Sequence, residues 1–271
     1  MRPVSRICRC VRGLAILVTG ATGGLGSLVC TELVARGANV IAHCRSREAL
    51  DALVATLGPT ARGVLADLAS IDETARLARE VGHVDVLVNN AGVGFGREQM
   101  RRETSHDGLE LRFAVNYLAP FILSYAMDGR IQANVQVASA GQRALDFDDL
   151  QTSRGYDGIL AYRRSKLAQV MLTFDLARLG RARCNVLHPG TFLDTPMLRE
   201  SGITPLGTAQ SGADAIMHVL ERTLAGDNGV YFDRLEPDRA DAQAYDVEAR
   251  RRLRDASFAL VSRVLPRPPG V

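Results

Sequence analysis

The sequence predicts an α/β fold with a doubly wound parallel sheet, built as a single domain. Short apolar runs alternate with segments of helical spacing along most of the 271 residues. The runs are continuous rather than alternating in polarity, which indicates strands buried on both faces of a sheet. Because the order is strand, helix, strand, the connections are expected to be right-handed parallel crossovers.

These patterns also give an expected order of elements. Strands are predicted at residues 14–19, 39–43, 64–67, 84–89, 134–139, 185–188 and 230–232. Helices are predicted at residues 24–36, 47–57, 71–81, 107–125 and 161–179. Residues 1–13 contain no apolar segment, so we expect a flexible basic tail rather than a signal peptide, followed by one domain over residues 14–271.

Composition narrows the function classes. The formal net charge of +3 is too small to indicate a nucleic-acid partner. No apolar run approaches the roughly 20 residues that a membrane span needs. The five cysteines include no C-x-x-C pair, so we expect free thiols in a reducing cytoplasm and no metal site. A cytoplasmic protein with no nucleic-acid or membrane partner is therefore predicted.

A cluster of glycines follows the first predicted strand and opens the first predicted helix. Residues 19–26 read TGATGGLG. Glycine allows tight turns, and a helix N-terminus offers free N–H groups to a phosphate. In this setting we interpret the cluster as a dinucleotide-binding loop rather than as a flexible turn. The residues expected to bind the cofactor here are Gly20, Thr22, Gly23, Gly24, Leu25 and Gly26.

The end of the second predicted strand indicates which dinucleotide is bound. An NAD site normally places an acidic residue there to hold the ribose hydroxyls. Residues 43–46 read HCRS and contain no acid, whereas the Arg45 guanidinium suits a 2′-phosphate. We therefore predict NADP(H) rather than NAD(H), with Arg45 and Ser46 at the phosphate. The alternative is that Arg45 is one of many solvated surface arginines.

Tyr162 and Lys166 lie four residues apart on one predicted helix, and hence on one face. The pKa of a free tyrosine is about 10, and a cation one turn away is expected to lower it toward the working range. Lys166 is the only lysine in a chain with 33 Lys and Arg residues. For six tyrosines, random placement gives this spacing about 2% of the time. We therefore interpret Lys166 as functional rather than as a chance surface lysine.

Taken together, these motifs resemble those of the short-chain dehydrogenases/reductases, which have a Rossmann-like fold. TGxxxGxG, NNAG at 89–92, a later serine, YxxxK and a PG pair occur in that family's order over about residues 14–232. The glycines also fit the TGxxGxxG of longer relatives that modify nucleotide sugars, but chain length and NNAG favour the shorter proteins. Stretches such as FAVNYLAPF (113–121) and LHPG (187–190) are similar to the retinol-dehydrogenase-like and WW-domain-oxidoreductase-like branch.

The resemblance implies a role for each catalytic residue. Ser139 would hydrogen-bond the substrate carbonyl, and Tyr162 would donate the proton. Lys166 would bind the nicotinamide ribose and hold the pKa of the tyrosine down. Asn116 would hold a water that links Lys166 to solvent. The plainer alternatives are that Ser139 caps a strand end and that Asn116 satisfies a helix kink.

The resemblance also implies the rest of the cofactor site. Asp67 and Leu68 would flank the adenine, although Asp67 also suits a helix N-cap. Val137 would back the nicotinamide, and Pro189 and Gly190 would pack against it. The adenosine side would be lined by Asn89, Ala91 and Gly92.

The sequence departs from the family pattern in two places. The family expects a threonine four residues after the PG pair, but Asp194 occupies that position, so either Thr191 or Thr195 is expected to bind the carboxamide. Asp128 and Gly129 shorten a helix that often forms the family's oligomer interface. A homo-oligomer, either dimer or tetramer, therefore stays an open expectation.

The leading prediction is an NADPH-dependent reductase of a ketone, aldehyde or quinone-like carbonyl. The segment 191–212 resembles a lid and is largely apolar, which favours a hydrophobic substrate. Two alternatives stay open: oxidation of an alcohol, and a nucleotide-binding sensor that keeps the fold without turnover.

Overall fold

The computed structural model describes residues 10–96 and 98–268, and its centre is one eight-stranded sheet. The strand order is β3-β2-β1-β4-β5-β6-β7-β8, with every pairing parallel except that of β7 with β8. The strands are β1 (Ala15–Val18), β2 (Asn39–Cys44), β3 (Ala61–Leu65), β4 (Val86–Asn89), β5 (Ala133–Val137), β6 (Arg183–His188), β7 (Tyr231–Asp233) and β8 (Glu236–Asp238). The predicted doubly wound α/β fold is confirmed.

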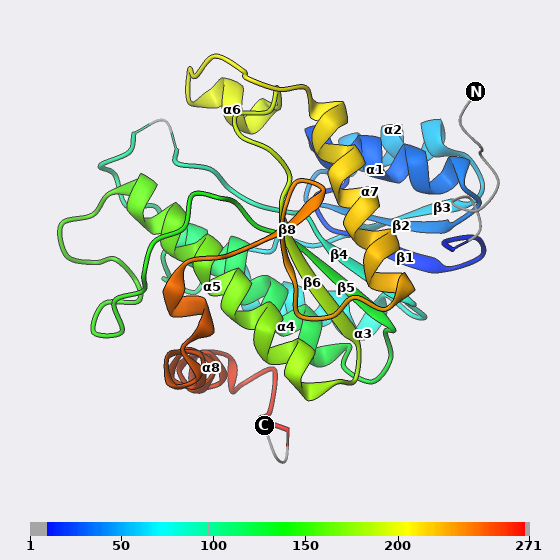
Figure 1. Cartoon of the computed structure of the whole chain (residues 1–271). Helices are drawn as coiled ribbons and strands as arrows, with labels where there is room; N and C mark the ends of the chain where they lie inside the picture. The colour runs from blue at the N-terminus through cyan, green and yellow to red at the C-terminus, as the bar shows by residue number, and fades with distance from the viewer. Residues whose placement is uncertain (1–9, 97, 269–271) are drawn as a thin grey trace.

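Helices cover both faces of the sheet (Figure 1). One layer contains α1 (Gly24–Ala35), α2 (Arg47–Leu57) and α7 (Ala209–Ala225). The other contains α3 (Ile71–Glu80), the π-helix η2 (Phe113–Leu118), α4 (Ala119–Ala126) and α5 (Gly158–Leu179). The short helices α6 (Pro196–Glu200) and η3 (Ala242–Tyr245) precede α8 (Val247–Val261), which packs against α5.

Burial explains why the central strands read as unbroken apolar runs. In β4, the side chains of Val86 and Val88 join the core under α1 and α7, while Leu87 joins the core under α3 and α4. Both faces of the strand are thus removed from water, as in parallel sheets generally. Because β1 pairs in parallel with both β2 and β4, the ends of these strands meet at one edge of the sheet.

Several boundaries differ from the sequence expectation. The third strand runs through residues 61–65 rather than 64–67, because Val40 to Cys44 of β2 pair with Ala61 to Leu65. The helix predicted at 107–125 starts only at Leu111, after a bridge between Thr104 and Glu110. Helices α6, α7 and α8 and the antiparallel β8 were not predicted.

Val11, which was expected in a flexible tail, is instead part of the core. Residues 1–9 lie outside the described part of the chain, but Val11 is fully buried in the core under α1. Its carbonyl accepts from Leu14 N at 3.1 Å, and Gly13 N donates to Gly37 O at 2.8 Å. In the described residues, no helix combines the length and hydropathy needed to cross a membrane.

Replacing Val11 with alanine is expected to lower the free energy of unfolding by about 1–3 kcal/mol, because a fully buried side chain loses two methyl groups. Urea unfolding measures the change, and Arg12→Ala is the control at the neighbouring exposed position, expected within about 0.5 kcal/mol of wild type. Equal effects of the two variants would show that this segment is not part of the core.

Candidate active site

The glycine loop lies at the carboxyl end of β1 and turns directly into α1. Gly20 has a φ of +65°, a region that favours glycine, and Gly23 N donates to Gly20 O at 3.1 Å. A side chain at Gly26 would clash with the Gly20 carbonyl oxygen. The loop therefore needs glycine at these positions for its own geometry.

The first turn of α1 is left open to a ligand. Its N-cap, Gly23, has no side-chain cap, so the first N–H groups of the helix lack a side-chain acceptor. Side-chain caps are present on α2, α3, α5, α6, α7 and α8. An uncapped N-terminus beside glycines suits a pyrophosphate group, so the predicted loop fits a dinucleotide.

His43, at the end of β2, ties the glycine loop to the segment after β3. Its Nδ1 accepts from Gly20 N at 3.3 Å, and its Nε2 lies 3.1 Å from Ala66 O. Because the Ala66 carbonyl can only accept, Nε2 carries the proton and Nδ1 is free to accept. Burial lowers the pKa of His43 to about 4, partly opposed by the bond to Ala66. The imidazole is therefore neutral at physiological pH, and the bond from Gly20 is kept.

The residues expected at the adenine end lie next to one another. Arg45 is exposed just past β2, and its charge helps to lower the pKa of Asp67 against the effect of burial. Asp67 accepts from Ala69 N at 2.9 Å and pairs with exposed His106, while Leu68 is buried. Ser70 rather than Asp67 caps α3. Ser46 caps α2 by accepting from Ala49 N at 3.4 Å, so its hydroxyl already has a structural partner.

Ser139, Tyr162 and Lys166 converge between the end of β5 and α5. Tyr162 is hydrogen-bonded to Ser139, and the Lys166 ammonium lies 5.8 Å from the centre of the Tyr162 ring. Lys166 Nζ donates to Val137 O at 2.8 Å and to Gln169 Oε1 at 3.2 Å. The structure thus brings together the three residues that the sequence singled out for proton transfer.

Burial dominates the electrostatics of this group. It raises the pKa of Tyr162, with the hydrogen bond to Ser139 acting in the opposite direction. It also lowers the pKa of Lys166 to about 7. The pKa of Tyr162 therefore lies above its ordinary value rather than below it as expected, because the effect of burial is larger than that of the hydrogen bond to Ser139.

Asn116 lies in η2 and holds the segment that follows β4. Its Oδ1 accepts from Val93 N at 2.8 Å, and its Nδ2 donates to Val93 O and Ser165 Oγ. π-Helical turns often occur at functional sites, because they reorient a side chain within a helix. A Cβ added to Gly92 would lie 3.3 Å from Asn116 Oδ1 and 3.6 Å from Lys166 Nζ, so both side chains border the same glycine.

Asn89 does not face the cofactor edge as expected. Its side chain is buried and donates to Asn134 Oδ1 at 3.2 Å inside the sheet. The next residue, Asn90, does reach the glycine loop, where its Nδ2 donates to Thr19 O at 2.9 Å and to Gly20 O. Ala91 N donates to Thr19 Oγ1 at 3.0 Å. Asn90 and Thr19 are therefore structural partners of the loop that sequence reasoning missed.

The two candidate threonines occupy different places. Thr191 is exposed, and its hydroxyl lies 3.0 Å from His188 Nε2. Thr195 caps α6 and lies over the glycine loop, because a Cβ on Gly24 would come within 3.1 Å of it. This geometry favours Thr195 as a cofactor contact. Gly190 joins β6 to this segment with a φ of +139°, and Pro189 before it is buried.

The comparisons with known proteins agree with this geometry. The family model described as short chain dehydrogenase matches residues 14–205. Retinol dehydrogenase 13 of Homo sapiens is 32% identical over 94% of this chain and 87% of its own length. The chain belongs to the short-chain dehydrogenase/reductase family. Its curated relatives place it in the retinol-dehydrogenase-like branch.

Two solved structures show how far this short-chain dehydrogenase/reductase shares the fold. A protein from Mycobacterium paratuberculosis has a TM-score of 0.79 and 25% identity, covering 93% of this chain and 94% of that one. A short-chain dehydrogenase from Burkholderia cenocepacia J2315, in complex with NADP, has a TM-score of 0.66 and 26% identity. The alignment covers 82% of this chain and 96% of the Burkholderia protein.

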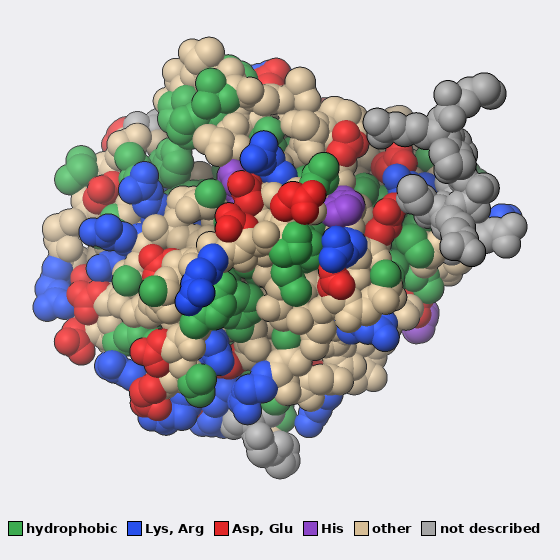
Figure 2. Space-filling view, viewed as in Figure 1, with side chains coloured by type: hydrophobic (Ala, Val, Ile, Leu, Met, Phe, Trp, Pro, Cys, Tyr) green, Lys and Arg blue, Asp and Glu red, His purple; other side chains and the backbone are tan. Residues whose placement is uncertain are grey.

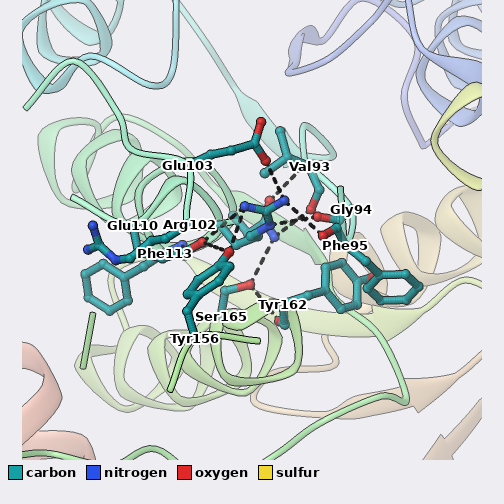
Figure 3. A network of polar contacts seen from close by, with 12 residues as sticks. Val93, Gly94, Phe95, Arg102, Glu103, Glu110, Phe113, Tyr156, Tyr162 and Ser165 are labelled. Carbon is teal, nitrogen blue, oxygen red and sulfur yellow. Dashed lines mark hydrogen bonds and ion pairs between the residues drawn. The ribbon is translucent and has the colours of Figure 1, made fainter. Parts of the chain in front are cut away.

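A second network that sequence reasoning missed includes Glu103, Glu110 and the backbone of Gly94 and Phe95 (Figure 3). Arg112 makes the hydrogen bonds that connect these groups. The buried guanidinium donates through Nε to Gly94 O at 2.9 Å and through Nη2 to Phe95 O at 3.0 Å. It also pairs with Glu103 and with buried Glu110. Phe95 in turn meets the Tyr162 ring edge-on, with ring centres 4.9 Å apart. Arg112 therefore fixes the backbone of the segment that packs on Tyr162.

Replacing Arg112 with methionine is expected to lower the free energy of unfolding by about 3–5 kcal/mol, because Glu110 would be left buried without its cation. Arg112→Lys keeps the charge but not the two hydrogen bonds to the Gly94 and Phe95 carbonyls. It should therefore lower the free energy of unfolding by less than Arg112→Met does, but still by a measurable amount. Chemical denaturation measures both. The control is Arg101→Met, which removes an exposed arginine paired with Glu98, and a similar loss there would contradict the assignment.

Replacing His43 with alanine is expected to weaken binding of the nicotinamide dinucleotide about tenfold, because Gly20 N and Ala66 O both lose their partner. His43→Asn keeps an acceptor near the Nδ1 position, whereas His43→Gln keeps a donor near the Nε2 position. If cofactor binding depends on the hydrogen bond from Gly20 rather than on the one to Ala66, the asparagine variant binds the cofactor more tightly than the glutamine variant does. Titration followed by cofactor fluorescence measures this, and the reverse order would overturn it.

Proposed function

We propose that this protein is an NADP(H)-dependent reductase that converts a hydrophobic ketone, aldehyde or quinone-like carbonyl to an alcohol. The observation that carries the proposal is the convergence of Ser139, Tyr162 and Lys166 at the edge of the sheet where the uncapped glycine loop also lies. Proton donor, cation and cofactor cradle are then assembled in one place, as carbonyl reduction requires.

The chain's own residues supply the proton and the orientation. The Ser139 hydroxyl donates a hydrogen bond to the substrate oxygen, and Tyr162 transfers its phenolic proton to that oxygen as the carbonyl becomes an alkoxide. When bound, NADPH would supply the hydride that the carbonyl carbon accepts. The Lys166 ammonium stabilises the resulting tyrosinate, which then regains a proton from solvent. Asn116 keeps Val93 and the segment after it in place beside Lys166.

Arg45 supports the choice of NADP(H). It is exposed at the carboxyl end of β2, beside Asp67 and without an ion pair to any residue that the structure describes. Its guanidinium is therefore available to a 2′-phosphate, and one charged hydrogen bond contributes about 1.5–3 kcal/mol. The NADP held by the Burkholderia relative is consistent with this choice.

Apolar side chains around the catalytic group support a hydrophobic substrate. The Phe95 ring packs on Tyr162, and a Cβ on Gly94 would meet the side chain of Met197. The segment with α6 also exposes Phe192, Met197 and Leu206. Figure 2 shows hydrophobic side chains gathered where this segment projects from the top of the molecule. Apolar side chains beside the proposed reacting group favour an apolar carbonyl compound.

Oxidation of an alcohol is the second candidate, because the curated relatives are named for retinol, itself an alcohol. The same residues serve that direction, with Tyr162 accepting the proton instead of donating it. We place the reaction in the cytoplasm, in keeping with the free thiols of Cys30, Cys44 and Cys184. No nucleic-acid or membrane partner is part of the proposal, and a dimer or tetramer stays a prediction.

Titration with NADPH and NADH tests the cofactor assignment. Wild type is expected to bind NADPH at least tenfold more tightly, and Arg45→Ala to remove that preference while binding NADH unchanged. Equal affinity for the two cofactors in wild type would show that Arg45 does not bind a 2′-phosphate. That result would favour alcohol oxidation over carbonyl reduction.

The same preparation tests catalysis. A panel of apolar ketones, aldehydes and quinones is assayed for NADPH consumption, with Tyr162→Phe as the matched variant that retains the ring but not the proton. The reductase is supported if wild type turns over and Tyr162→Phe binds cofactor without turnover. Tight cofactor binding with no turnover of carbonyls or alcohols in wild type would instead indicate a nucleotide-binding sensor.

A further inference from the structure

A chain of buried amides leads from Lys166 into the centre of the sheet. Lys166 Nζ donates to Gln169 Oε1 at 3.2 Å, and Gln169 Nε2 donates to Gln136 Oε1 at 3.0 Å. Gln136 Nε2 continues to Asn134 Oδ1 at 3.1 Å. Asn134 Oδ1 also accepts from Asn89 Nδ2. The chain therefore links α5, β5 and β4 through side chains alone.

These amides are deeply buried and held from the side by a hydroxyl. Gln136 and Gln169 are fully shielded from solvent, and Asn134 is 1% exposed. Ser124 Oγ, on α4, accepts from Asn134 Nδ2 at 2.9 Å and lies 3.4 Å from Gln136 Nε2. A buried polar network of this size is costly unless its members satisfy one another, so each amide has a fixed orientation.

Lys166 determines the direction of the whole chain. An ammonium can only donate, so the atom of Gln169 that faces it must be the oxygen. The amide nitrogen of Gln169 must then face an oxygen of Gln136, and the nitrogen of Gln136 an oxygen of Asn134. All three carbonyl oxygens therefore point along the chain toward the amine. Aligned dipoles of this kind favour the charged form of the group at their negative end.

Few other groups favour the ammonium. It faces the Val137 carbonyl from β5 and the Tyr162 ring from its own helix, while Asn116 Oδ1 borders the same glycine from η2. No carboxylate of the described residues contributes to the pKa of Lys166, which burial lowers to about 7. Among the described residues, the Gln169 oxygen is therefore the side-chain acceptor placed at hydrogen-bond distance from the amine.

We propose that Gln169 is a positioning residue for Lys166, and that the amides of Gln136 and Asn134 behind it keep the amine protonated in its place near the Tyr162 ring. The role of the amine in turnover rests on the proposed function, but its protonation does not. If the amides only satisfied one another within the core, replacing Gln169 would change stability without changing the titration of the amine.

Lys166 can be titrated directly because it is the only lysine in the chain. Protein labelled with ¹³C-lysine gives a single ε-methylene signal by NMR, and the signal is followed from pH 5 to pH 10 in the absence of substrate. Gln169→Leu removes the acceptor and is expected to lower the pKa of the amine by about one unit. Gln169→Glu places a carboxylate at the same position and is expected to raise it.

Two further variants separate positioning from core packing. Gln136 contacts Gln169 rather than Lys166, so Gln136→Leu is expected to shift the pKa of Lys166 in the same direction as Gln169→Leu but by less. This variant tests the proposal even if Gln169→Leu fails to fold. Thr173→Val is the control, since buried Thr173 donates to the Gln169 backbone carbonyl without joining the amide chain. It should leave the titration of Lys166 unchanged.

The results distinguish the positioning role of Gln169 from the proposed carbonyl reduction. An unchanged titration in Gln169→Leu and Gln136→Leu, or shifts of the same sign in Gln169→Leu and Gln169→Glu, would overturn the positioning role. A wild-type protein that titrates as expected but reduces no carbonyl would leave the positioning role standing and remove the proposed reaction. Where turnover is found, the alkaline limb of its pH profile should move with the NMR midpoint in each variant.

Discussion

The parallel pairing of β1 with both β2 and β4 is the constraint on which the site depends. This arrangement brings the glycine loop after β1, His43 and Arg45 at the end of β2, and the NNAG segment after β4 to a single edge of the sheet. None of these segments is near the others in sequence. The hydrogen bonds from Gly20 to His43 and from Asn90 to Thr19 and Gly20 then lock the three ends to one another. These hydrogen bonds hold the edge that the cofactor is proposed to occupy to the backbone of the sheet.

Removal from water is the second organising effect, and it acts oppositely on the two central groups. Burial favours neutral tyrosine and neutral lysine, so it raises the pKa of Tyr162 and lowers that of Lys166. The first effect suits the proton donor of the proposed reaction, because the phenol keeps its proton until it is hydrogen-bonded to the substrate oxygen. The lowered pKa of Lys166 disfavours the ammonium form, so hydrogen-bond acceptors are needed to stabilise the charge. The Val137 carbonyl and the Gln169 amide are placed where they do this.

Candidate site residues could be predicted from the sequence where they belong to a short motif. The glycine loop and the Tyr162 and Lys166 pair follow from residue type, spacing and position after a strand, whereas Ser139 was implied by the family resemblance. Asn89 was misjudged because a one-residue difference along a strand reverses the direction of the side chain. Asn89 still belongs to β4 and points into the sheet, whereas Asn90 lies beyond the strand and reaches the loop. Such a boundary is set by pairing with neighbouring strands, which one sequence does not display.

His43, Arg112 and Gln169 could not be identified in the same way, because the function of each depends on partners distant in sequence. Only Arg112 left a sequence signal, a charged residue at the start of the apolar stretch FAVNYLAPF. In the fold its fork spans two successive backbone carbonyls, which a lysine's single ammonium would not match. At position 166 the geometry instead suits lysine rather than arginine. An arginine there would stay charged without help from Gln169, but its planar fork does not suit a site that must contact Val137, Gln169 and Tyr162 around one compact centre. A chain that uses arginine for every other cation has kept lysine where size and a titratable proton both matter, and the amide chain behind it supports its charge.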